Sequence, residues 1–222
     1  MSKTPHPTST KRPQRQLAAI ISVDVVGFSR LMGADEDGTL STLKRLQKNI
    51  VSPQVKRHQG RIVKLMGDGA IIIFASVVDA VGAAIAIQQE MRGFNEDIPP
   101  EKAVAMRIGI NLGDVILEGA DIFGDGVNVA ARIQELCTPG GVALSATAYE
   151  HVNTKVDAEF VDVGERVLKN ITRKIRVFRW PDTQSHDVQR APALPDKPSI
   201  AVLPFDNMSR DPDQEYFADG VV

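Results

Sequence analysis

The stretch that decides the fold is RIVKLMGDGAIIIF, residues 61–74. Two aliphatic, strand-like runs flank the tripeptide Gly67-Asp68-Gly69. A Gly-Asp-Gly between two such runs favours a tight turn, because glycine and aspartate adopt the backbone angles that hairpin turns require. We therefore expect two antiparallel strands joined at residues 67–69.

Upstream of this hairpin, the pattern predicts one strand followed by one long helix. Residues 17–26, LAAIISVDVV, form a β-rich apolar run that Gly27 breaks. Apolar residues then recur at helical spacing over residues 35–58. Pro53 lies inside this segment and should kink or end the helix, because proline lacks the backbone N–H donor.

Downstream of the hairpin, helix and strand patterns alternate again. Ser76 is a plausible N-cap for a helix that runs through Met91. Further strands are expected at 106–112 and 142–144, a helix at 128–136, and a final strand pair at 159–167 and 175–180. The order β-α-β-β-α-β with C-terminal additions predicts an α+β fold, the split βαβ arrangement, with an antiparallel sheet and helices on one face.

Composition excludes several classes of protein. The chain has 222 residues with 26 Lys and Arg against 28 Asp and Glu, a formal charge of −2, so it lacks the positive field that nucleic-acid binding requires. Its apolar runs reach only about ten residues, too short for a membrane span of about 20. The single cysteine, Cys137, cannot form an internal disulfide, which predicts a reducing compartment such as the cytoplasm.

The chain divides by composition into a central block and polar flanks. Residues 1–16 are basic and Pro-rich without a useful apolar core, so we expect a disordered leader rather than a signal peptide. Residues 17–180 form one patterned block, and residues 181–198 form a Pro-rich linker.

Two aspartates stand out in the central block. Asp24 interrupts an apolar strand, and a buried carboxylate without partners costs several kcal/mol. Taken alone, it could simply end the strand, face water or cap the next helix. Asp68, at the hairpin tip, is by itself a turn former.

Taken together, the two aspartates favour a metal site. In a split βαβ sheet the end of the first strand lies beside the hairpin tip, and Mg²⁺ is commonly held by one or two carboxylates plus substrate phosphates. The following residues, Val25, Val26, Gly27 and Phe28, would offer backbone N–H groups to phosphate oxygens where strand turns into helix.

A third feature is DIFGDGVNVAARI, residues 121–133. Asn128 and Arg132 are four positions apart, hence on one face of a helix. The planar guanidinium suits phosphoryl oxygens. An ordinary surface arginine and a helix-start asparagine are the alternative interpretation.

These three motifs, ISVDVVGF, VKLMGDGAIIIF and DIFGDGVNVAARI, occur in the order found in class III nucleotidyl cyclases, and residues 17–180 resemble the catalytic core of that family. The resemblance implies a ferredoxin-like core, a head-to-tail homodimer with active sites at its interface, and conversion of ATP to 3′,5′-cyclic AMP and pyrophosphate with two Mg²⁺ or Mn²⁺ ions.

The resemblance also implies residue roles. Asp24 and Asp68 would bind the metals, Asn128 would orient the ribose, and Arg132 would stabilise charge at the α-phosphate. Lys64 and Asp121 would recognise the purine. Lysine only donates and ionised aspartate only accepts, which matches the acceptor N1 and donor amino group of adenine and mismatches guanine.

One position departs from the family pattern. Many relatives carry a triphosphate-binding lysine near the final strand pair, where this chain has Ile171; Lys169 or Arg173 are possible substitutes. A guanylate or relaxed-specificity cyclase, and a silent nucleotide-binding or dimerisation module, therefore stay as alternatives.

The C-terminal tail, residues 199–222, resembles the start of a TolB-like domain, which in some bacterial cyclases precedes helical repeats. Its single strand-like run cannot bury its faces alone. We expect either a truncated domain or a loose tail.

Overall fold

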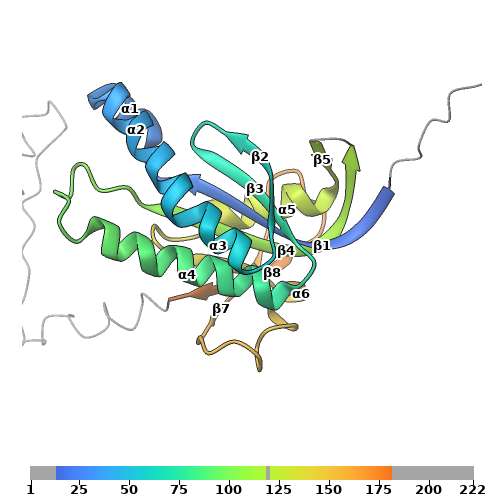
Figure 1. The fold of residues 1–222 in the computed structure, drawn as a ribbon. Coiled ribbons are helices and arrows are strands. Elements are labelled where there is room, and N and C mark those ends of the chain that lie inside the picture. Colours follow the sequence, from blue (N-terminus) through green and yellow to red (C-terminus); the bar gives the residue numbers. More distant parts are fainter. Residues whose placement is uncertain (1–13, 119–120, 182–222) are drawn as a thin grey trace, which may run out of the picture. The chain divides into compact units, whose positions relative to one another are not determined.

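The computed structural model describes residues 14–118 and 121–181. In these residues the strands form one sheet in the order β2-β3-β1-β4-β6-β8-β7, with β5 paired to β4 (Figure 1). Neighbouring strands are antiparallel except β4 and β6, which are parallel. The strands are β1 (Gln14–Val25), β2 (Arg61–Met66), β3 (Gly69–Phe74), β4 (Met106–Glu118), β5 (Asp121–Phe123), β6 (Val142–Ser145), β7 (Val161–Arg166) and β8 (Ile175–Trp180).

The helices connect and cover these strands. They are α1 (Phe28–Ala34), α2 (Glu36–Leu46), the π-helical turn η1 (Gln47–Val51), α3 (Ser52–Arg57), α4 (Val77–Asn95), α5 (Asp125–Glu135) and α6 (Ala146–Tyr149). No helix in the described ranges is long and apolar enough to cross a membrane.

The long helix expected over residues 35–58 is present, but it does not end at Pro53. The Asp35 carboxylate caps α2 by accepting from the Gly38 N–H at 2.9 Å. The chain then continues through η1 into α3, with Pro53 in the first turn of α3. Proline lacks an N–H and crowds the carbonyl four residues earlier, and the wider π turn directly before it absorbs that disturbance.

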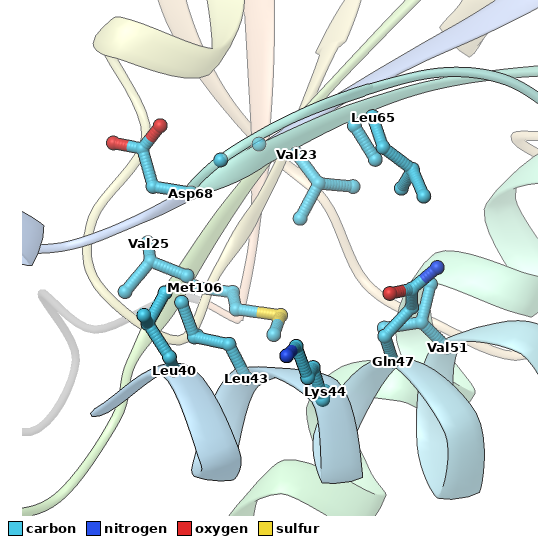
Figure 2. A pocket seen from close by; sticks show the side chains of 13 residues that line it. Val23, Val25, Leu40, Leu43, Lys44, Gln47, Val51, Leu65, Asp68 and Met106 are labelled. Carbon is cyan, nitrogen blue, oxygen red and sulfur yellow. The ribbon is translucent and has the colours of Figure 1, made fainter. Parts of the chain in front are cut away.

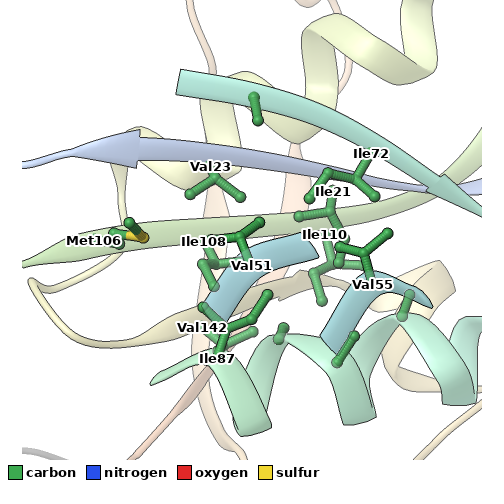
Figure 3. Packing of buried hydrophobic residues seen from close by; sticks show 14 of the residues in the cluster. Ile21, Val23, Val51, Val55, Ile72, Ile87, Met106, Ile108, Ile110 and Val142 are labelled. Atoms are coloured by element: carbon green, nitrogen blue, oxygen red, sulfur yellow. The ribbon is translucent and has the colours of Figure 1, made fainter. Parts of the chain in front are cut away.

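Apolar side chains of the central strands alternate between two buried layers. Ile21, Ile108 and Ile110 face α3 and α4, where Val55 and Ile87 meet them (Figure 3). This layer is the main core. The α+β class, the antiparallel-dominated sheet and the helical layer on this face are as the sequence predicted.

Helix α5 packs against the other side of the same strands. Ala130 of α5 lies in a cluster with Ala18, Ile20 and Ile71, which alternate with the residues of the main core. The close approach of α5 depends on Gly109 of β4. A Cβ at Gly109 would lie 2.3 Å from the backbone N of Gln134, so only glycine fits beneath the helix.

Several boundaries differ from the sequence expectation. Strand β1 begins at Gln14 and ends at Val25, and β4 runs to Glu118, where it meets the unexpected strand β5. The short helices α1 and α6 were also not expected. Such short elements have too few residues for a periodic pattern. Most of the proposed leader and linker, and all of the TolB-like segment, lie outside the described residues.

Candidate active site

Asp24 is paired rather than simply exposed at the end of β1. It lies opposite Arg107 of β4 on one side and Gly69 of β3 on the other. Its Oδ2 accepts hydrogen bonds from Nη2 of Arg107 at 2.5 Å and from Nε2 of Gln134 at 3.4 Å. The helix cap interpretation is wrong, because the N-cap of α1 is Gly27 and no side chain caps that helix.

Asp68 lies beside Asp24 as the hairpin prediction required. It occupies the turn between β2 and β3, and its carbonyl accepts from the N–H of Val25 at 3.0 Å. Since Gly69, the residue after Asp68, pairs directly with Asp24, the turn that holds Asp68 lies next to the end of β1. The fold thus places two aspartates from distant parts of the chain at neighbouring backbone positions.

The backbone donors between β1 and α1 are fewer than the sequence predicted. The N–H of Val25 donates to Asp68, and that of Val26 donates to Ala105 at 2.9 Å, so neither is free for a phosphate. This part of the expectation is wrong because β1 keeps its sheet pairing to its end. Gly27 adopts a left-handed φ of 67°, and Phe28 begins α1, where an N–H group has no intrahelical acceptor.

Lys64 and Asp121 form an ion pair between elements far apart in sequence. Nζ of Lys64 in β2 lies 2.9 Å from Oδ1 of Asp121 in β5, and the side chains are 49% and 54% exposed. The antiparallel pairing of β5 with β4 places Asp121 opposite Glu118, so the chain doubles back toward β2. A donor and an acceptor therefore stand side by side at the surface.

Asn128 and Arg132 lie on α5, as expected. Asn128 is exposed, and Arg132 is partly exposed, with its guanidinium hydrogen-bonded to Glu135 one turn later. Both lie on α5, and the close packing of α5 on the sheet depends on Gly109. Their position therefore follows from the packing of α5.

Ile171 is a packing residue in this structure. It is partly buried against a cluster that includes Leu168 and Ile133, so an apolar side chain suits the position. The two basic residues nearest in sequence, Lys169 and Arg173, are both exposed. Either of these basic side chains is accessible to a ligand, whereas Ile171 offers no charge to a phosphate.

Sequence reasoning missed two partners of Asp24, namely Arg107 and Gln134. Arg107 is the one charged residue in the expected strand 106–112, and a basic residue in such a run was a signal comparable to Asp24 itself. Its Nε is buried and has no hydrogen-bond partner within the described part of the chain. Gln134 carries no such signal, because a polar residue on a helix is ordinary.

Comparison with known proteins agrees with this geometry. The family model for the adenylate and guanylate cyclase catalytic domain matches residues 11–179. The chain belongs to this family. Over 214 residues the cyclase chain is 49% identical to "Putative adenylate cyclase 3" of Rhizobium meliloti, covering 94% of this chain and 36% of that relative. It thus spans about a third of the relative's length.

Solved structures show the same fold. A crystal structure of an adenylate/guanylate cyclase/hydrolase from Silicibacter pomeroyi is 40% identical, with a TM-score of 0.70, and covers 76% of this cyclase chain and 99% of that chain. The adenylyl cyclase CyaB from P. aeruginosa is 22% identical with a TM-score of 0.66, covers 76% and 95% of the two chains, and supports the fold alone.

Two side chains near the end of β1 are of the kind that hard divalent cations bind. No group of three or more His, Cys, Asp or Glu side chains gathers as a metal cluster within residues 14–118 and 121–181. Asp24 and Asp68 supply two carboxylates, which fits Mg²⁺ when phosphate oxygens complete the coordination. The residues present therefore suit a metal shared with a nucleotide.

Proposed function

We propose that this cyclase domain is an adenylate cyclase that converts ATP to 3′,5′-cyclic AMP and pyrophosphate. The observation that carries the choice of ATP is the pairing of Lys64 with Asp121 at 2.9 Å. Lys64 would donate to the N1 acceptor of adenine, and Asp121 would accept from its amino group. Guanine presents the reverse pattern, with an O6 acceptor and an N1 donor.

The ion pair does not stand in the way of the nucleotide. Both side chains are about half exposed, and an exposed salt bridge contributes about 0–1 kcal/mol. Separating them to admit a purine edge therefore needs little free energy. New hydrogen bonds to adenine would offset that loss.

Asp24 and Asp68 would hold two Mg²⁺ or Mn²⁺ ions. When bound, such ions lower the pKa of a coordinated hydroxyl and neutralise charge on the triphosphate. In the proposed reaction the ribose 3′-oxygen bonds to the α-phosphorus while the bond to the β-phosphate oxygen breaks. The hydroxyl proton leaves to solvent, and pyrophosphate departs.

The remaining residues would position and stabilise the substrate. Asn128 would orient the ribose, and the Arg132 guanidinium would stabilise charge that develops at the α-phosphate. The N–H groups of Gly27 and Phe28 would contact the triphosphate, with Lys169 or Arg173 in place of the missing lysine. To reach the α-phosphate, the Arg132 guanidinium must first break its hydrogen bond to the exposed Glu135.

We further propose that two copies form a head-to-tail homodimer with composite sites. One copy would supply Asp24 and Asp68, and the other would supply Lys64, Asp121, Asn128 and Arg132. In support of this division, Asp121 of β5 pairs with Lys64 of β2, and Asn128 and Arg132 lie together on α5, whereas Asp24 and Asp68 lie at the end of β1 and at the β2–β3 turn. Each dimer would then hold two equivalent sites.

A second candidate function has one observation in its favour. Ile171 is partly buried against a core cluster, so the family's triphosphate lysine has no counterpart at that position. A silent nucleotide-binding or dimerisation module would tolerate this loss. The pairing of Lys64 with Asp121, by contrast, argues against a third candidate, a guanylate or relaxed-specificity cyclase.

The test is turnover by the purified chain with ATP or GTP, in Mg²⁺ or Mn²⁺. Formation of cyclic AMP that needs the metal and exceeds cyclic GMP formation supports the proposal. Nucleotide binding without product in either metal would favour the silent module, and faster GTP turnover would favour the guanylate cyclase.

Two wider expectations stay as proposals. The buried, free Cys137 is consistent with a reducing, cytoplasmic location. The Rhizobium relative is much longer than this chain, and the TolB-like resemblance of residues 199–222 would place a further domain after the cyclase.

A further inference from the structure

A small apolar cavity lies on the side of the sheet opposite the Asp24 carboxylate. Val23 and Val25, whose side chains alternate with Asp24 along β1, form its back wall. Its volume is about 240 Å³. The lining residues come from α2, η1, β1, the hairpin and β4 (Figure 2): Val23, Val25, Leu40, Leu43, Lys44, Gln47, Val51, Leu65, Gly67, Asp68, Gly69, Ala70 and Met106.

The mouth of this cavity exposes large apolar side chains to solvent. Leu40 of α2 is 37% exposed and Leu65 of β2 is 55% exposed, and both line the cavity. Scattered exposed leucines are ordinary, but apolar residues that surround a hollow are typical of binding sites. An apolar ligand would remove this surface from water.

The cavity carries one cationic side chain, Lys44. Figure 2 shows its ammonium group directed from α2 toward the strands. Lys44 is exposed, and no ion pair within the described residues uses it, so its ammonium group is available to a ligand.

The acidic residue of the lining does not cancel this charge. Asp68 borders the cavity, but Figure 2 shows its carboxylate pointing away from the other side chains. Beside Lys44, Gln47 adds an amide to the polar edge of the lining. The charge that a bound ligand would meet is therefore positive.

The π turn η1 helps to form this cavity. Gln47 and Val51, its first and last residues, both contribute to the lining. A π turn is a costly irregularity that occurs frequently at functional sites. Here it places one polar and one apolar side chain on the same wall.

We propose that this cavity binds a small monocarboxylate with an apolar tail. The tail would lie among Leu43, Val51 and Met106, and the carboxylate would pair with Lys44. The cavity volume of about 240 Å³ is far above the ~10–15 Å³ that one water molecule needs, so a small organic ligand fits. Octanoate has this size and chemistry.

The cavity also adjoins the hairpin that carries Asp68. Asp68, Gly69 and Val25 form part of its wall, and Val25 is hydrogen-bonded to Asp68 through the backbone. A bound tail would restrict this hairpin. The next expectation rests on the proposed cyclase function. Octanoate should lower the metal concentration needed for half-maximal activity, because a hairpin already ordered by octanoate loses less conformational entropy when the metal binds.

The binding test is a titration of the full chain with octanoate, followed by methyl NMR. We expect saturable shifts for the methyl groups of Leu43, Val51 and Met106, and none for Val115 and Ile122 on the other face of the sheet. Lys44→Met keeps the stem of the side chain and removes its charge. It should weaken octanoate binding about fivefold or more, since charge-assisted hydrogen bonds are the stronger ones.

The matched control is Lys48→Met, one turn further along the same helical run. Lys48 is exposed and does not line the cavity, so its loss should leave octanoate binding unchanged. Equal weakening in both variants would overturn the assignment to Lys44. So would equal binding of 1-octanol, which has the same tail without the carboxylate.

Two further outcomes would also overturn the proposal. One is the absence of saturable shifts up to about 10 mM octanoate, a range that reaches weak millimolar sites. The other is a shift of the same methyl groups with protein concentration alone, which would assign the cavity to a contact between copies. The NMR titration measures binding without turnover. Its result can therefore be interpreted even if the chain proves not to be an active cyclase.

Discussion

The carboxylate of Asp24 and the guanidinium of Arg107 lie 2.5 Å apart on directly paired positions of β1 and β4. Their side chains are 26% and 29% exposed, so both charges are partly removed from water. This contact answers the question that Asp24 raises in the sequence. A carboxylate is tolerated in the apolar strand because a cation from the next strand compensates for its lost hydration.

Removing the cation should therefore destabilise the fold. Arg107→Met leaves Asp24 without its main partner, and we expect a loss of about 1–3 kcal/mol in the free energy of unfolding by urea denaturation. Asp24→Asn combined with Arg107→Met should be less destabilised than Arg107→Met alone. Lys174→Met is the control, because its pair with Glu165 is exposed at both ends and should change stability by less than about 0.5 kcal/mol. Equal losses in the two single variants would contradict this account.

Exchanging the purine-recognition pair should reverse the base preference. In Lys64→Glu combined with Asp121→Asn, an acceptor replaces the donor and an amide donor becomes available for guanine O6. We expect the ratio of kcat/KM for ATP to that for GTP to fall about 100-fold or more, from two changed hydrogen bonds of about 1–3 kcal/mol each. Turnover assays with both nucleotides measure this ratio, and an unchanged ratio would remove Lys64 and Asp121 from base recognition.

Two inactive variants should complement each other. Asp24→Ala and Arg132→Ala are each expected to lose cyclase activity, because each removes one half of the composite site. In an equal mixture, half of the dimers are mixed and one of their two sites is intact, so about a quarter of the native activity should return. Mixing Asp24→Ala with Asp68→Ala provides the control. Both changes lie in the same half, so no activity should return.

Gly109 should not tolerate a side chain. A Cβ there would lie 2.3 Å from the backbone of α5, so Gly109→Ala should displace the helix and destabilise the chain by about 1–3 kcal/mol or more. Activity should fall as well, because α5 carries Asn128 and Arg132. Gly93→Ala in α4 is the control, since a Cβ at Gly93 meets nothing within 4 Å. That change should stabilise the helix by about 0.5–1 kcal/mol, measured by urea denaturation.

Cys137 should make stability depend on alkaline pH. Burial raises the pKa of its thiol from 9.0 to about 11, so the folded chain binds this proton more tightly than the unfolded chain does. Its contribution is fully present below pH 9 and is lost as the pH rises toward 11. The difference in unfolding free energy between the native chain and Cys137→Ala should therefore decrease over that range. A difference that stays constant with pH would contradict the buried, protonated thiol.

Much of the fold could be predicted from residues 61–74 and their neighbours. The hairpin, the cap at Ser76 and the strand at Ile175–Trp180 all appear where the pattern placed them. Each of these signals depends on residues within one or two turns of chain, and such local preferences act in the same way whatever the tertiary fold. The position of Asp68 beside Asp24 followed from the predicted order of strands, which sets the end of the first strand next to the hairpin turn.

Other features depended on contacts between distant segments. Arg107 reaches Asp24 across 83 positions, Lys64 reaches Asp121 across 57, and the Val26 N–H is taken by Ala105. The strand register, the antiparallel pairing of β5 with β4 and the packing of α5 on Gly109 set these distances. Local sequence patterns carry no information about them, because they arise only when several elements pack together and satisfy one another's polar groups.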